Sequence, residues 1–274
     1  MERHVKRVQH ISSRQNALVA RYKGVASGED HGLMLLDGLH LIVEAMAARV
    51  AITDVLVSSE VSDRADIQPI VDDIQRAGAS VVVGSAPVLR AVSPVRSASP
   101  IVALAARPRS GESLVYRPLP PLVLIACGVQ DPGNVGAIAR AAEAAGATGL
   151  VAADACADPF GWKALRGSMG SALRLPIVVD RSIEHAVARA RHHGCRILAM
   201  VPRDGDGLYS ADLTGPTAIL VGGEGAGLPS SLVGAAERRV TIPMNAPVES
   251  LNTAVTAALI LYEARRQRAP VALV

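Results

Sequence analysis

Aromatic residues are scarce in this sequence of 274 residues, which contains one Trp, one Phe and four Tyr. Because half of the residues are hydrophobic, the core must be built from Val, Leu, Ile and Ala, as in sheets covered by helices. Cysteine is scarce too: Cys127, Cys156 and Cys195 are far apart, so they match neither a disulfide framework nor a zinc site. We therefore expect a reduced, cytoplasmic environment and no bound metal.

Long hydrophobic runs are also absent. The N-terminus MERHVKRVQH is charged with no apolar run behind it, and no later stretch is long enough to span a bilayer. The patterns HExxH and GxSxG do not occur, and no nucleophile has a plausible base beside it. These absences predict a soluble protein with no membrane partner. They favour neither the metalloproteases that carry HExxH nor the hydrolases that carry GxSxG.

Lysine is rare as well, and the basic residues are unevenly distributed. The chain carries a net charge of +3, but six cations and one anion give the segment up to Lys23 a charge of +5, so the rest sums to −2. Such a basic arm is either a solvated, partly disordered terminus or a contact for the phosphates of a nucleic acid. Its cations are Arg3, Lys6, Arg7, Arg14, Arg21 and Lys23.

Residues 1–106 predict this basic arm followed by a small α/β domain. Apolar segments at 33–38, 54–59, 80–84 and 100–106 alternate with helical patterns at 40–49, 67–76 and 86–91. Residues 107–121, RPRSGESLVYRPLPP, have four prolines and no sustained period, which predicts a linker.

Residues 122–274 predict a second α/β domain, in keeping with the length of the chain. Its strands are nearly continuous apolar runs with helices between them. One of these helices should span 134–145. Strands of this kind form a parallel sheet covered on both faces. They lie at 122–127, 149–153, 176–180, 196–201 and 217–222.

The first motif is DPGNVGAIARAAEAAG, residues 131–146. Asn134 can simply cap a helix after the turn residues Pro132 and Gly133. Capping does not explain Arg140, whose Ala-rich neighbours suggest close packing, where a guanidinium would need an anionic partner. Arg140 is therefore a candidate functional residue.

The second motif is GGEGAGLP, residues 222–229. Its glycines form either a plain turn or a loop whose backbone approaches a ligand closely. Leu228 stands where the dinucleotide fingerprint needs its third glycine and where the phosphate loop needs its lysine, so both patterns fail. Glu224 is a carboxylate without an evident structural need.

The third motif, IPMNAPVESLNTAVTAALILYE, follows a short strand at 239–242 and leads into a long helix starting near Ser250. Glu249 or Ser250 could cap this helix, and residues 251, 255, 259 and 262 form an ordinary apolar stripe. This structural explanation leaves out the polar pair Ser250 and Asn252 beside an apolar loop.

In this order, the three motifs resemble those of the SpoU/TrmH family of RNA ribose 2′-O-methyltransferases, within the SPOUT superfamily. A fourth block, RGSMGSALRLP at 166–176, is similar to the family's Ser-x-Gly-Ala segment. The resemblance covers roughly residues 122–268. Upstream, ISSRQNALV and LLDGLHLIVEA look like the small RNA-binding domain that many members carry.

The resemblance implies an α/β SPOUT domain with a parallel sheet and a deep trefoil knot, an exception to the rule against threaded chains. It also implies a smaller N-terminal α/β RNA-binding domain and a homodimer formed through the C-terminal domain, in which each site borrows residues from its neighbour. The implied cofactor is S-adenosylmethionine. The matching cofactor-binding positions are Gly222, Gly223, Ile242, Met244 and Leu251.

For catalysis, the family pattern gives Arg140 the central role. A ribose 2′-hydroxyl would attack the methyl group of the cofactor. Because a guanidinium normally cannot act as a base, we expect Arg140 to orient the RNA phosphate and to stabilise charge developing on the oxygen. The residues expected to shape the site around it are Asn134, Glu224, Ser250 and Asn252.

The expected substrate is RNA, with 23S ribosomal RNA preferred to transfer RNA. Methylation of ribosomal RNA for antibiotic resistance also fits the architecture. Two further alternatives are an RNA-binding protein that keeps the fold without catalysis and an ordinary nucleotide-dependent α/β enzyme. The five polar residues together argue against the former, and the failed glycine spacings argue against the latter.

Overall fold

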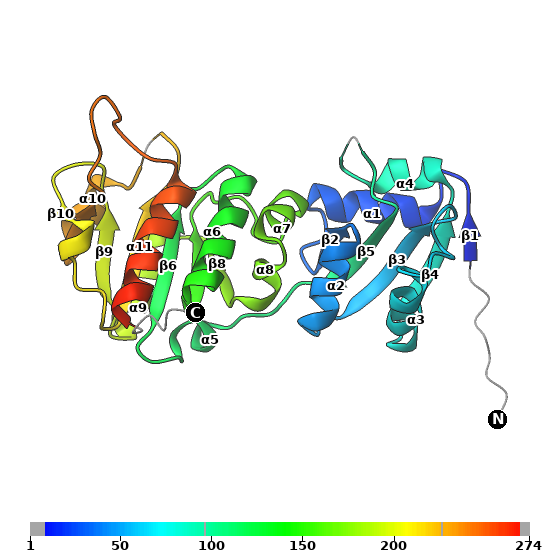
Figure 1. The fold of residues 1–274 in the computed structure, drawn as a ribbon, viewed down its shortest axis with the longest axis horizontal. Coiled ribbons are helices and arrows are strands. Elements are labelled where there is room, and N and C mark those ends of the chain that lie inside the picture. The colour runs from blue at the N-terminus through cyan, green and yellow to red at the C-terminus, as the bar shows by residue number, and fades with distance from the viewer. Residues whose placement is uncertain (1–8, 96, 226, 269–274) are drawn as a thin grey trace. The chain divides into compact units, whose positions relative to one another are not determined.

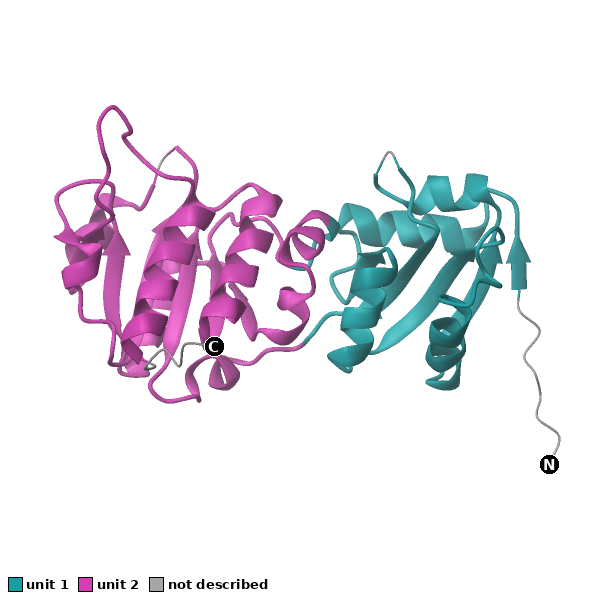
Figure 2. Ribbon diagram, in the orientation of Figure 1, with its two compact units in different colours: residues 1–108, 160–162 teal, residues 109–159, 163–274 magenta. Residues whose placement is uncertain are grey.

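The chain forms two compact units in a computed structural model that describes residues 9–95, 97–225 and 227–268 (Figure 1). One unit comprises Met1–Pro108 with Phe160–Trp162, and the other comprises Arg109–Pro159 with Lys163–Val274 (Figure 2). Arg3, Lys6 and Arg7 of the basic arm lie outside the described residues. None of the helices in the described ranges is long and apolar enough to cross a bilayer.

Within its described residues, the first unit has a five-stranded sheet with the order β1-β4-β3-β5-β2 and four helices. Strands β1, β4 and β3 are parallel, and β5 runs antiparallel to both of its neighbours. The elements are β1 (Gln9–Ile11), α1 (Ala17–Ser27), β2 (Leu33–Asp37), α2 (Leu39–Ala47), β3 (Ile52–Ser58), α3 (Gln68–Arg76), β4 (Ser80–Gly84), α4 (Ala86–Val92) and β5 (Ile101–Ala106).

Helix α1 corrects the extent of the predicted basic arm. The Asn16 side chain caps this helix by accepting a 2.9 Å hydrogen bond from the Leu18 amide. Val19, Tyr22 and Val25 recur every three residues and are buried, and the charges between them concealed this period. Arg21, counted among the arm's cations, instead pairs with Asp54 at 3.0 Å.

The second unit contains a seven-stranded sheet with the order β10-β12-β9-β11-β6-β7-β8. Every neighbouring pair is parallel, so the predicted α/β fold with a parallel sheet is confirmed. Its strands are β6 (Leu122–Cys127), β7 (Gly149–Ala153), β8 (Ile177–Asp180), β9 (Arg196–Met200), β10 (Asp206–Gly207), β11 (Thr217–Gly222) and β12 (Arg238–Thr241). Its helices are α5 (Glu112–Tyr116), α6 (Pro132–Ala145), α7 (Trp162–Ser168), α8 (Ser171–Arg174), α9 (Ile183–His192), η1 (Leu208–Ser210), α10 (Ser230–Ala235) and α11 (Thr253–Arg268).

The segment predicted as a linker, residues 107–121, is partly helical. Helix α5 lies within it and belongs to the second unit, where Val115 and Tyr116 are buried. The Tyr116 ring stacks on His193 with 4.4 Å between ring centroids. Gly111 precedes this helix, and Pro118 follows its C-cap residue Arg117. A helix of five residues is too short to show a period in the sequence.

Helices α6 and α11 pack against each other and start at the edge of the sheet where the strands end (Figure 1). The far end of α11 is anchored by Arg268, which donates hydrogen bonds to the carbonyl oxygens of Leu213 at 2.7 Å and Pro120 at 2.8 Å. The two helices therefore bring their first turns together at one edge of the sheet.

Candidate functional site

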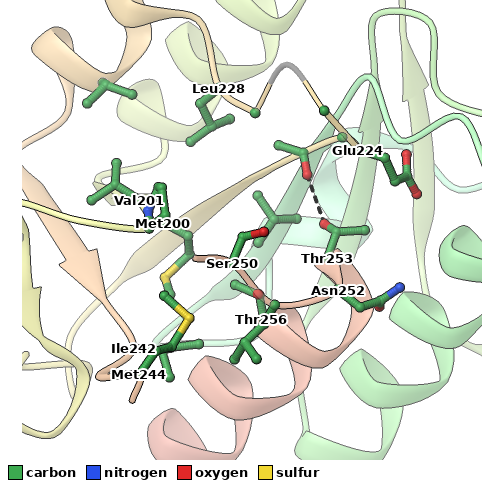
Figure 3. A pocket seen from close by; sticks show the side chains of 18 residues that line it. Met200, Val201, Glu224, Leu228, Ile242, Met244, Ser250, Asn252, Thr253 and Thr256 are labelled. Atoms are coloured by element: carbon green, nitrogen blue, oxygen red, sulfur yellow. Dashed lines mark hydrogen bonds between the residues drawn. The ribbon is translucent and has the colours of Figure 1, made fainter. Parts of the chain in front are cut away.

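A cavity of about 580 Å³ lies at the carboxyl ends of the parallel strands β9, β11 and β12 and at the start of α11 (Figure 3). Ligands of open α/β sheets bind at this edge, and small-molecule sites have volumes of roughly 300–1,000 Å³. The cavity is lined by Met200, Val201, Pro202, Val221, Gly222, Gly223, Glu224, Gly225, Gly227, Leu228, Val233, Ile242, Met244, Ser250, Leu251, Asn252, Thr253 and Thr256.

The glycine-rich loop is packed backbone against backbone. A Cβ atom at Gly222 would lie 2.3 Å from the carbonyl carbon of Gly227, and one at Gly223 would lie 2.0 Å from the Gly128 oxygen. Thr253 at the start of α11 donates a 2.9 Å hydrogen bond to the Gly222 oxygen, drawn as the dashed line in Figure 3. The loop therefore presents fixed backbone groups to the cavity, which only glycine permits at these two positions.

A chain of side-chain hydrogen bonds joins the three motifs. Asn252 caps α11, because its Oδ1 accepts from the amides of Ala254 at 2.9 Å and Val255 at 3.3 Å. Its Nδ2 therefore donates to Asn134 Oδ1 at 3.1 Å, and Asn134 Nδ2 in turn donates to Glu224 Oε1. Each amide is thereby held in one orientation.

The start of helix α6 differs from the sequence prediction. The capping residue is Asp131, whose Oδ1 accepts a 2.9 Å hydrogen bond from the Asn134 amide, and the helix begins at Pro132. Because Asp131 supplies the cap, the side chain of Asn134 is available to Glu224 and Asn252. Helix α11 likewise begins at Thr253 with Asn252 as its cap, not near Ser250.

Glu224 is held as a carboxylate by this chain of hydrogen bonds. Desolvation raises the pKa of Glu224, which is an exposed residue, but hydrogen bonds from Asn134, from its own backbone and from the Gln130 amide at 3.2 Å outweigh desolvation and lower the pKa below its ordinary value. Both carboxylate oxygens accept hydrogen bonds. Glu224 therefore fastens the glycine-rich loop to the start of α6.

All five predicted cofactor-binding residues line the cavity, together with the predicted residues Glu224, Ser250 and Asn252. Asn134 joins them through its hydrogen bonds to Glu224 and Asn252. Other lining residues, among them Met200, Thr253 and Thr256, were not among the predicted site residues. The end of the predicted strand at 196–201 was a usable signal for Met200, because a parallel sheet brings its strand ends to one edge.

Arg140 does not line this cavity. It is exposed and has neither a hydrogen bond nor an ion pair within the described part of the chain. The expectation of close packing around it is wrong, because the small residues of α6 that pack inward, such as Ala139 and Ala142, lie on another face of the helix.

The apolar stripe of α11 also differs from the prediction, because much of it faces outward. Val255 is 47%, Leu259 38% and Tyr262 51% exposed. The helix instead packs on its own chain through smaller and aliphatic residues, including Ala257 and Leu261. Three large apolar side chains on successive turns thus form an uncovered face.

Comparisons with known proteins relate this site to a described family. The pattern of the SpoU rRNA Methylase family matches residues 121–262. An uncharacterized tRNA/rRNA methyltransferase of Synechocystis, slr1673, is 30% identical over 264 residues, covering 94% of each chain. The 23S rRNA (guanosine(2553)-2′-O)-methyltransferase RlmP of Bacillus subtilis is 28% identical over 261 residues, covering 94% of this chain and all of that protein.

Solved structures agree with the sequence comparisons. The SpoU methyltransferase AviRb of Streptomyces viridochromogenes, in complex with the cofactor AdoMet, superimposes with a TM-score of 0.83 at 26% identity. The match covers 92% of this chain and 98% of that structure. An AdoMet-bound rRNA methyltransferase of Sinorhizobium meliloti shares the fold, with a TM-score of 0.83 at 24% identity and coverage of 94% and 98%.

Proposed function

The chain belongs to the SpoU rRNA Methylase family, and from this premise we propose that it methylates the 2′-hydroxyl of a ribose in RNA, with 23S ribosomal RNA as the preferred substrate. The observation that carries the proposal is the cavity at the strand ends together with the hydrogen-bond chain that ties the first motif to it, because Asn252 of the cavity lining donates to Asn134, 118 positions away. Relatives named as 23S rRNA 2′-O-methyltransferases support the choice of substrate.

S-adenosylmethionine fits the cavity in size and in lining. Gly222 and Gly223 offer backbone groups, and Ile242, Met244 and Leu251 offer apolar side chains for its adenosine. The bound cofactor supplies a methyl group on a positively charged sulfur, which makes that methyl a good electrophile.

No residue of the cavity is placed to act as a base. Glu224 accepts hydrogen bonds with both oxygens, and its pKa is below the ordinary value, so it is a poor proton acceptor near neutral pH. In the transfer, the 2′-oxygen bonds to the methyl carbon as the carbon–sulfur bond breaks with its electrons on sulfur. The hydroxyl proton passes to water or to phosphate.

We also propose that Arg140 acts in the site of a second copy of this chain in a homodimer. It lies outside its own cavity and has no partner among the described residues. The exposed residues Val255, Leu259 and Tyr262 of α11 provide an apolar face of the kind that protein interfaces bury. In that site Arg140 orients the RNA phosphate and stabilises charge on the attacking oxygen.

The remaining expectations concern the chain as a whole. A trefoil knot in the C-terminal unit is supported by the agreement of the fold with a solved SpoU methyltransferase, which gives a TM-score of 0.83. RNA binding by the N-terminal unit is supported by the exposed cations Arg14 and Lys23, which have no ion pair within the described ranges. A cytoplasmic location follows from a ribosomal RNA substrate.

Methyl transfer from labelled S-adenosylmethionine to purified 23S ribosomal RNA tests the function directly. We expect label on a ribose 2′-oxygen, and loss of one such site from ribosomal RNA in cells that lack the gene. Loss from transfer RNA alone would favour the alternative substrate. If the protein binds RNA but transfers no labelled methyl group to it, the protein is an inactive RNA-binding member and the proposal is contradicted.

A further inference from the structure

Met169 combines exposure with an unusual backbone conformation. It follows helix α7 with a φ of 50° and is 44% exposed. Residues other than glycine and asparagine rarely adopt this left-handed conformation at the end of a helix. Within the described ranges, the other such non-glycine residues are polar, namely Arg49, Asp154 and Asp204. An apolar side chain held outward in this conformation suggests a function for that side chain.

The backbone around Met169 is held firmly against α6. A Cβ atom at Gly136 would lie 2.3 Å from the Ala164 oxygen and 2.9 Å from the Ser168 nitrogen, so α7 and α6 touch through their backbones. On the other side of Met169, Arg174 of α8 donates hydrogen bonds of 2.7 and 2.9 Å to Glu143 of α6.

These two contacts hold the turn that contains Met169 against the stretch of α6 that contains Arg140. Arg140 follows Gly136 by four residues and precedes Glu143 by three, so all three lie on the face of α6 that carries α7 and α8. Met169 lies in the turn between α7 and α8. An exposed thioether and an exposed, unpaired guanidinium therefore project from one surface.

We propose that Met169 is a substrate-contacting residue that packs on the base of the RNA nucleotide whose phosphate Arg140 holds. The inference rests on the proposed function, in which Arg140 acts on the acceptor ribose. A methionine side chain adapts to a flat ring and makes favourable sulfur–aromatic contacts. Because it reads no base edge, it steadies the nucleotide without selecting its identity.

The test compares Met169→Gly and Met169→Leu with the wild-type protein, using a 23S ribosomal RNA transcript as substrate. Glycine adopts the left-handed conformation freely, so Met169→Gly should melt at the same temperature or higher and bind S-adenosylmethionine normally. We expect its KM for RNA to rise up to about tenfold, with a smaller change in kcat, because a methionine sulfur against an aromatic ring contributes at most about this factor. Met169→Leu should recover most of the loss, and Val179→Ala, which shortens an apolar side chain that is 61% exposed on β8, should behave as wild type.

A wild-type KM in Met169→Gly would overturn the proposal. The proposal would also be overturned if Met169→Gly had a lower oligomeric mass by light scattering and recovered its activity at high protein concentration. Met169 would then contact a second copy of the chain. Filter binding of the same transcript, measured without methyl transfer, separates this inference from the proposed function. If the wild type transfers no methyl, the proposed function fails, and equal RNA affinity of wild type and Met169→Gly would still reject the contact.

Discussion

At the scale of single residues, the candidate site divides its polar groups into two kinds. Asn252, Asn134 and Glu224 satisfy one another through a directed chain of hydrogen bonds. Arg140 has no such partner among the described residues. The hydrogen-bonded side chains are therefore suited to hold the glycine-rich loop in place. Arg140 is available to bind an anionic group of another molecule.

Replacing Arg140 by Ala should lower kcat for RNA methylation by about 10²–10³-fold, the loss typical of removing one group that stabilises developing charge. The Kd for S-adenosylmethionine, measured by calorimetry, should stay within a few fold because Arg140 does not line the cavity. Arg181→Ala removes another exposed cation and serves as the control. Near-normal turnover in Arg140→Ala would remove this residue from the mechanism.

Cofactor binding should weaken in acid because Glu224 must stay ionised. Its pKa is lowered in the folded protein, so the stabilising effect on the loop is complete above the ordinary glutamate pKa of about 4.3 and is lost as the pH falls through the lowered value. The Kd for S-adenosylmethionine should therefore be constant from neutrality down to the ordinary glutamate pKa and rise as the pH falls further. Circular dichroism at each pH separates this effect from global unfolding.

The variant Glu224→Gln provides the matching comparison. If the amide oxygen keeps the hydrogen bond from the Gln130 amide, the amide nitrogen faces Asn134 Nδ2, which is another donor. In the opposite orientation Asn134 Nδ2 keeps an acceptor, but one weaker than a carboxylate, and the Gln130 amide loses its acceptor. We expect weaker cofactor binding at neutral pH and no further acid dependence. An acid dependence equal to that of the wild type would assign the titration to another group.

At the scale of elements, the glycine-rich loop depends on close backbone contacts. The space at Gly222 and Gly223 is taken by the backbones of Gly227 and Gly128, which have no flexible side-chain atoms that could move aside. The loop is thus part of the packed structure of the unit, and its shape is set before any ligand arrives.

Gly222→Ala should destabilise the protein by about 3 kcal/mol, the upper end of the usual cost of overpacking, and should abolish cofactor binding. The control is Gly234→Ala in α10, where a Cβ atom meets nothing within 4 Å. Alanine is the better helix former, so this control should be neutral or up to about 1 kcal/mol more stable. Equal chemical denaturation curves for the two variants would contradict the close packing.

At the scale of the whole molecule, the proposed homodimer would account for an uncovered apolar face and for an exposed cation that has no partner among the described residues. The exposed face of α11 is formed by Val255, Leu259 and Tyr262. Arg140 lies on α6, the helix against which α11 packs. A homodimer formed over these helices would cover the apolar face and give Arg140 a site to act in.

Light scattering at micromolar concentration should therefore give twice the 28.4 kDa of the chain. The double variant Leu259→Glu with Tyr262→Glu should give a mass near that of one chain, because burying two carboxylates in an apolar interface is unfavourable. Leu114→Glu on α5, another exposed leucine, should leave the mass unchanged. Wild-type protein with the mass of a single chain would contradict the homodimer.

The sharing of residues can be measured by mixing inactive variants. If Arg140 acts in the partner's site, co-refolded Arg140→Ala and Glu224→Ala chains should recover part of the activity that neither has alone. A mixed dimer would contain one site with both residues intact. No recovery, although mixed dimers form, would place Arg140 and Glu224 of one chain in the same site.

Much of the second unit was predictable from the sequence. Its parallel strands are continuous apolar runs, and the expected strands at 122–127, 149–153 and 217–222 have the same limits in the structure. Helices α1 and α5 were missed, because charges hid the buried residues of α1 and α5 is too short to show a period. Local pattern reveals an element only when it is long and regular.

The candidate site was predicted unevenly for the same reason. The residues predicted to bind the cofactor come from motifs at strand ends, and all of them line the cavity. The roles of Asn134 and Asn252 depend on their contact across 118 positions, which no local pattern contains. The sequence suggested that Asn134 caps α6, whereas Asp131 caps it.

By itself, the sequence determined the class of fold through its apolar periodicity and the resemblance to the family through the order of its motifs, and it supplied the predicted residues of the site. Only the tertiary structure decided what each residue does with its neighbours. It made Glu224 the acceptor of a chain of hydrogen bonds, left Arg140 outside its own cavity and turned the apolar stripe of α11 outward. These outcomes depend on which faces meet when the chain folds, and distance along the sequence carries no information about that.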